Sequence, residues 1–73
     1  MTYKLFDEVA LRKDVAKYGL KKDAVGTIVE LYPATNGLEV EFFDKEGETI
    51  AVATLDSADV YAHQSTGSQS RSA

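Results

Sequence analysis

The chain has 73 residues and a net charge of −4, which bounds it to one small acidic domain. A domain of this size buries only about 60% of the surface that its unfolded chain exposes, so its stability depends on regular packing or on a partner. Cysteine is absent, which excludes disulfides and thiolate metal sites. Because the sequence has neither a membrane-length apolar stretch nor a secretory signal, we expect a soluble cytoplasmic protein.

The N-terminal segment is compatible with two secondary structures. Apolar residues alternate with polar or small ones over 8–11, which is typical of a short strand. Leu5 and Phe6 would then pack across one end of the domain. The alternative is a helix at 3–18 packed on a three-stranded sheet, but this segment is poorly capped and short for a stable helix. We therefore favour the strand.

A long charged loop is expected over 12–24. Val15, Tyr18 and Leu20 are the apolar residues that would pin it to the core, and Gly19 supplies backbone freedom that other residues lack. Long loops are where small barrels place recognition surfaces, so this loop is one candidate region for binding.

The strongest strand signal begins at Val25. The segment 25–32 is apolar on both sides, as expected for a central barrel strand with a bulge, and Gly26 would permit close approach of another backbone. Pro33 cannot donate to a ladder, so the strand ends there. The Asn-Gly pair at 36–37 then suits a turn.

The segment 38–43 alternates apolar and acidic residues, with the apolar ones directed inward. The alternation breaks where Phe43 follows Phe42, so one of the two aromatic rings has to point away from the core. Two interpretations of Phe43 stay open at this point. It is either an exposed anchor for a partner, or it is buried against the N-terminal segment.

The second half of the chain completes the sheet. A turn at 44–47 precedes a strand at 48–55, whose alanines indicate either close approach to a neighbour or a weakly covered outer face. One helical turn at 56–59, capped by Asp56 or Ser57, leads to a closing strand at 60–62.

The tally of strands predicts an all-β fold. It is a small five-stranded SH3-like barrel, with a long first loop and one helical turn before the last strand. Residues 1–63 form this single domain, and the polar, serine-rich residues 64–73 form a C-terminal tail.

No group in the sequence is committed to chemistry. The one histidine, His63, lies beside the polar tail, and no serine or cysteine nucleophile stands out as its partner. The acidic residues lack the spacing of a calcium loop, and a filled barrel offers no cleft for a carboxylate pair. We therefore expect a protein that is not an enzyme and that has no cofactor and no specific metal site.

Charge is unevenly distributed, and this gives the first candidate surface. Acidic residues dominate from 30 to 59, where Phe43 is the surplus aromatic residue. An aromatic anchor ringed by carboxylates is suited to a basic protein partner. The candidate partner-binding residues are Glu39, Glu41, Phe43, Asp44, Glu46 and Glu48.

Basic residues gather in the first loop and give the alternative surface. The candidate nucleic-acid patch consists of Arg12, Lys13, Lys17, Tyr18, Lys21 and Lys22. The segment 22–29 resembles the KOW-type motif of ribosomal and transcription-elongation proteins, which implies binding to nucleic acid. Members of that group are usually basic, whereas this chain is acidic, so nucleic acid is the second choice.

Over about residues 5–60 the chain more closely resembles a family of short bacterial proteins catalogued only as a domain of unknown function. The segments that carry the resemblance are 6–11, 18–22, 25–30, 39–44 and 47–52. It implies a compact barrel without catalytic residues, and a gene that in some bacteria lies beside toxin-like partners. Similar barrels also serve as accessory subunits of redox and photosynthetic complexes, an analogy of fold alone.

Two functional hypotheses follow from these observations. The first is a protein-interaction module of the antitoxin, immunity or accessory type, which binds a basic or toxin-like protein through its acidic sheet face. The second is a nucleic-acid-binding barrel that uses the basic loop. Homo-oligomerisation through the strand at 48–55 would be compatible with either one.

Overall fold

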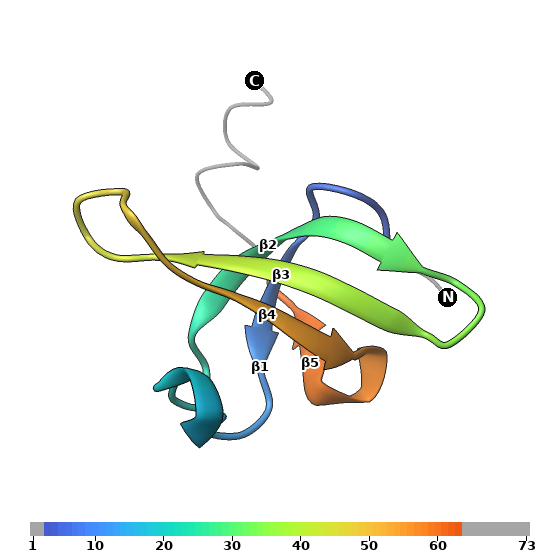
Figure 1. Ribbon diagram of the computed structural model, residues 1–73, viewed down its shortest axis with the longest axis horizontal. Helices are drawn as coiled ribbons and strands as arrows, with labels where there is room; N and C mark the ends of the chain where they lie inside the picture. The colour runs from blue at the N-terminus through green and yellow to red at the C-terminus, as the bar shows by residue number, and fades with distance from the viewer. Residues whose placement is uncertain (1–2, 64–73) are drawn as a thin grey trace.

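The computed structural model describes residues 3–63, which form five antiparallel strands in one curled sheet (Figure 1). The order of strands in the sheet is β4-β3-β2-β1-β5. This is the predicted all-β, SH3-like barrel, and the predicted tail at 64–73 lies outside the described residues. The elements are β1 (Glu8–Leu11), η1 (Ala16–Tyr18), β2 (Val25–Tyr32), β3 (Gly37–Phe43), β4 (Thr49–Asp56), η2 (Ser57–Asp59) and β5 (Val60–Ala62).

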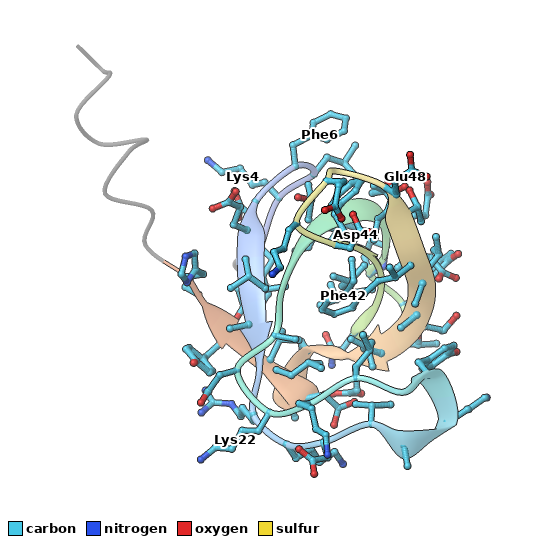
Figure 2. All side chains as sticks on the ribbon, turned by 90° about the vertical axis from the view of Figure 1, so that its left-hand side faces the viewer. Lys4, Phe6, Lys22, Phe42, Asp44 and Glu48 are labelled. Carbon is cyan, nitrogen blue, oxygen red and sulfur yellow. The ribbon has the colours of Figure 1, made fainter. Side chains whose placement is uncertain are left out.

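The core is built from alternate residues of the strands, and in β1 the intervening Ala10 is buried as well. Side chains of a strand point to opposite faces, so one face of each strand lines the interior and the other faces outward. Figure 2 shows the strands surrounding Phe42, which fills the middle of the barrel. The buried core consists of Val9, Leu11, Leu20, Ile28, Leu38, Val40, Phe42, Ala53, Leu55 and Val60.

Gly26 allows β2 and β3 to pack closely around that ring. Gly26 pairs directly with Phe42, and a Cβ placed on it would lie 2.9 Å from Phe42 Cδ2 and 2.6 Å from Val40 Cγ1. Such distances are shorter than van der Waals contact, so no larger residue fits without displacement of the core. The close approach predicted for Gly26 is confirmed.

Two irregularities bend the sheet. The β2–β3 register shifts between Ile28 and Glu30, which is the bulge predicted for the central strand, and the β3–β4 register shifts between Phe42 and Phe43. At the second shift β4 carries the extra residue, Ile50, because Thr49 pairs with Phe43 while Ala51 pairs with Phe42. Bulges of this kind increase local twist and help a sheet to close.

The structure corrects the prediction for the N-terminal segment in one respect. The strand β1 is present and the alternative helix at 3–18 is wrong. The packing predicted for Leu5 and Phe6 across the barrel end is also wrong, because Leu5 is 47% exposed and Phe6 is 73% exposed (Figure 2). The Phe6 N–H donates to the Ile28 carbonyl (2.7 Å) and its φ is +73°, so the backbone pairing turns the ring outward. Tyr3 packs against the core instead.

The long first loop and the helical turn are as predicted. Leu20 is buried, and Val15 and Tyr18 pack against the core, which ties the loop to the barrel. In η2 the Asp56 carboxylate accepts from the Ala58 N–H (2.9 Å), while the Asp59 carboxylate accepts from the Asp56 N–H (2.9 Å). This reciprocal capping box stabilises the turn that leads into β5.

The packing at Gly26 gives a direct test of the fold. We expect Gly26→Ala to lower the free energy of unfolding by about 1–3 kcal/mol, because the added methyl group overpacks the interior. Urea denaturation followed by circular dichroism measures this loss. The matched control is Gly37→Ala in β3, where the shortest approach of an added Cβ is 3.2 Å, to the Thr35 side chain, and the loss is smaller. Equal stability of Gly26→Ala and the unsubstituted protein would contradict the packing argument.

Candidate functional site

The acidic face comprises the six residues predicted to bind a partner, and β3 organises them. Residues two apart on a strand share a face, so Glu39, Glu41 and Phe43 line the outer side of β3 while Leu38, Val40 and Phe42 line the core. Phe43 is 43% exposed, which excludes its burial against the N-terminal segment. The inward and outward assignments predicted for this strand are confirmed.

Hydroxyl groups hold the two half-buried carboxylates of β3 in place. Thr54 Oγ1 donates to Glu39 Oε2 (2.8 Å), and the Tyr32 hydroxyl donates to the same oxygen (3.1 Å). Thr49 Oγ1 donates to Glu41 Oε2 (2.6 Å). Each carboxylate is therefore oriented before any partner arrives, which lowers the entropic cost of using it for recognition.

The other acidic residues lie in the β3–β4 turn. Asp44 Oδ1 accepts from the N–H groups of Glu46 and Glu48 (both 2.9 Å), so Asp44 shapes the turn. The side chains of Glu46 and Glu48 are exposed. The turn also requires Gly47, whose φ of +86° lies in the left-handed region that favours glycine. The structure thus places the turn carboxylates at the end of the strand that carries Phe43.

The negative charge of this face affects the pKa of Tyr32. Partial burial of its hydroxyl, followed by its hydrogen bond to Glu39 and the negative charges of Glu39 and Glu30, raises the Tyr32 pKa above its ordinary value. Glu30 pairs in register with Glu39 across the β2–β3 ladder. Two carboxylates opposite each other repel, so a cation that binds between them would be favourable.

The predicted basic patch is divided by its own internal contacts. Arg12 Nε donates to the Val60 carbonyl (3.0 Å) with its guanidinium over the Tyr61 ring, and Lys13 pairs with Asp59 (3.4 Å). The Tyr18 hydroxyl accepts from the Thr54 N–H (3.4 Å). Tyr18 thus connects the loop to β4 while its ring packs against the core.

The remaining lysines of the patch have fewer contacts. Lys17 lies over the Tyr18 ring with Nζ 5.4 Å from its centroid, and the Lys22 N–H donates to Asp14 Oδ1 (2.8 Å). Lys21 is exposed. Figure 2 shows Lys22 at the end of the barrel opposite Asp44 and Glu48, so the molecule is electrically polarised along this direction.

Three exposed apolar residues near the acidic face were not predicted as site residues. Ile50 is 55% exposed and Val52 is 49% exposed, whereas the smaller Ala53 on the same strand is buried. The sequence predicted a strand over 48–55 without fixing which face is inward. In the structure Leu55 is buried, and the alternation of β4 then directs Val52 outward. Phe6 is the third, and it lies at the same end of the barrel as Asp44 and Glu48 (Figure 2).

Residues 5–62 match a family described as a domain of unknown function (DUF4926). The chain belongs to this family. The match confirms the family resemblance in the sequence, and membership of DUF4926 assigns no functional residue. No curated protein and no solved structure gives a match.

Within residues 3–63 of this DUF4926 chain, no three histidine or carboxylate side chains are grouped to hold a metal ion. His63 is exposed, and its backbone N–H donates to the Glu8 carbonyl (3.1 Å). No helix in the described part of the chain is both long and apolar enough to cross a membrane.

The Tyr32 contact yields a test of how the acidic face is built. We expect Glu39→Gln to lower the Tyr32 pKa, because the substitution removes the negative charge that disfavours the phenolate. The shift is incomplete, since partial burial still raises the pKa. NMR signals of the tyrosine ring followed against pH measure this change. Glu41→Gln is the matched control and leaves the Tyr32 pKa in place.

The sign of the pH effect follows from the same contact. A raised tyrosine pKa means that the folded state favours the neutral hydroxyl. The Tyr32 hydrogen bond therefore contributes to stability below the ordinary tyrosine pKa, and this contribution is lost as the pH rises through the raised value. A Tyr32 pKa that is indifferent to Glu39→Gln would contradict the geometry.

Proposed function

We propose that this protein is a non-enzymatic interaction module that binds a basic protein partner through the acidic face. The observation that carries the proposal is the half-exposed ring of Phe43 on the same face of β3 as the oriented carboxylate of Glu41. An aromatic anchor beside fixed charges supplies both parts of a tight interface. The ring provides apolar burial, and the carboxylates provide orientation and selection.

The distribution of charge supports a basic partner. The acidic turn and the lysine-bearing loop lie at opposite ends of the barrel (Figure 2). Within the turn the carboxylates of Asp44, Glu46 and Glu48 outnumber the one cation, Lys45, so the turn presents a net negative potential. Such a field accelerates the encounter with a positively charged surface and repels acidic ones. The net charge of −4 acts in the same direction.

An antitoxin, an immunity protein or an accessory subunit in a bacterial cytoplasm would have this character. A small rigid barrel can cover a basic active site with its acidic face while contributing no chemistry of its own. The family resemblance, with its toxin-like gene neighbours, points in the same direction. The proposal therefore commits to a protein partner that carries clustered lysine or arginine.

Nucleic acid is the alternative partner, and the internal contacts of the loop argue for ranking it second. Arg12 and Lys13 are already engaged with Val60 and Asp59, and the Tyr18 hydroxyl is engaged with β4. The free cations of the patch are then too few for the multiple phosphate contacts on which nonspecific affinity depends. Lys17, Lys21 and Lys22 are the residues that a nucleic acid would still meet.

The test is capture of the native partner with tagged protein from its host. We expect Phe43→Ala to weaken capture by about tenfold or more, as truncation of an interface anchor does, and Glu41→Gln to weaken it mainly at low salt. Biolayer interferometry with the identified partner measures both effects. Thr49→Val, which removes only the hydroxyl that orients Glu41, is expected to give a smaller loss.

The matched control is the double variant Lys21→Ala and Lys22→Ala. It leaves protein capture unchanged if the acidic face is the interface. The contradicting result is capture that survives Phe43→Ala and Glu41→Gln but fails in the lysine variant. Fluorescence titration against single- and double-stranded RNA and DNA at low salt then decides for the nucleic-acid alternative.

A further inference from the structure

The outer edge of β4 has a defined direction of hydrogen bonding. β4 is the terminal strand of the sheet formed by residues 3–63. In an antiparallel strand, the N–H and C=O groups of one residue point to one edge and those of the next residue point to the other. The N–H groups of Thr54 and Asp56 bond to Tyr18 and to Asp59, neither of which belongs to β3. Both amides therefore face the outer edge.

Val52 has the same parity as Thr54, so its N–H and C=O also face the outer edge. Its register supports this assignment, since Val52 pairs with Glu41, as Thr54 pairs with Glu39. The described residues supply a partner for the amides of Thr54 and Asp56 but none for that of Val52. The edge of β4 is thus covered at its C-terminal half and open around Val52.

The open part of the edge is also apolar. Ile50 and Val52 are about half exposed there, and Ile50 occupies the bulge of β4. An open strand edge with apolar side chains invites pairing with another chain, and proteins usually cover or charge such an edge. In this protein the C-terminal half is covered by Tyr18 and Asp59, so the opening is confined to one end.

The charge beside the opening selects the kind of chain that can occupy it. Glu41 pairs with Val52, so a strand added outside β4 would lie two strand spacings, about 10 Å, from β3. The stem of a lysine or arginine can pack across Val52 while its charged end reaches the Glu41 carboxylate. Thr49 holds that carboxylate in place.

We infer that the edge of β4 around Ile50–Val52 binds an extended, basic segment of a protein partner by strand addition. This inference rests on the proposed function and specifies how the partner is recognised. Backbone hydrogen bonds at Val52 supply affinity, and alternate basic side chains directed at the acidic face supply selectivity. The partner segment is therefore a strand that alternates basic and apolar residues.

A second copy of this chain fits the same edge less well. Pairing of two β4 edges would bring the Glu41 and Glu48 carboxylates of both copies toward one interface. Like charges that approach across a strand pair are destabilising, and each chain already carries a net charge of −4. The charge pattern thus favours a basic segment over self-association.

The test uses a synthetic peptide of seven residues that alternates lysine and valine and has neutral ends. Titration into isotopically labelled protein is followed by amide NMR spectra. We expect the largest shifts at Ile50–Val52 and weaker shifts at Glu41. Two N-methylated peptides provide the matched comparison. One carries methyl groups on the amides of its odd-numbered residues, and the other carries them on the amides of its even-numbered residues. A strand uses only one set of amides for pairing, so one of these peptides loses binding and the other retains it.

Variants of Val52 test the same bond from the protein side. Val52→Pro removes an N–H that faces the open edge and leaves the β3–β4 ladder intact, and we expect it to weaken peptide binding by about two- to tenfold, as loss of one backbone hydrogen bond does. Val52→Thr keeps the N–H and retains binding. If Val52→Pro does not fold, the comparison of the two methylated peptides still tests strand addition.

Each other outcome overturns the inference. Binding that is the same for both methylated peptides but is lost in Glu41→Gln rejects strand addition while the proposed acidic interface stands. If no peptide shifts the amide NMR signals, the protein does not recognise basic strands and the inference is rejected. The proposed function is then tested separately by capture of the native partner. Self-association at Ile50–Val52 in the absence of peptide, measured by light scattering, assigns the edge to a second copy.

Discussion

The packing of Phe42 against the bare backbone of Gly26 is the constraint on which the rest of the structure depends. Phe42 is the largest fully buried side chain among residues 3–63, and its ring fits because Gly26, the residue paired with it, has no side chain. Because Phe42 points inward and successive side chains of a strand alternate, Glu39, Glu41 and Phe43 lie on the outer face of β3. The candidate site is therefore a consequence of core packing.

The same logic explains the composition of β4. Leu55 and Ala53 are buried, so the larger Ile50 and Val52 face outward. Ala51 and Ala53 lie on the inner face of this strand, where Ala51 pairs directly with Phe42. The alanines thus mark close approach rather than a weakly covered outer face. Because the small alanines take the inner positions of β4, the larger Ile50 and Val52 take outer positions next to the acidic face.

Electrostatics and packing act together at both ends of the barrel. On the acidic face, hydroxyl groups of Thr49, Thr54 and Tyr32 bind the carboxylates of Glu39 and Glu41, which fixes their direction and does not neutralise their charge. In the basic loop, carboxylates and carbonyls of the chain itself engage part of the cationic side chains, as at Lys13 and Arg12. The acidic face is thus oriented toward an external cation, while much of the basic loop contributes to its own attachment to the barrel.

The sequence by itself determined the strands, their order of inward and outward residues, the close approach at Gly26 and the family, because periodicity of two and turn residues are local properties of the chain. The tertiary structure decided three other matters. Backbone pairing of Phe6 to Ile28 turned that ring outward, the register of β4 exposed Ile50 and Val52, and contacts between distant residues engaged Arg12, Lys13 and Tyr18. Each depends on which residues from remote parts of the chain become neighbours, and that information exists only in the folded sheet.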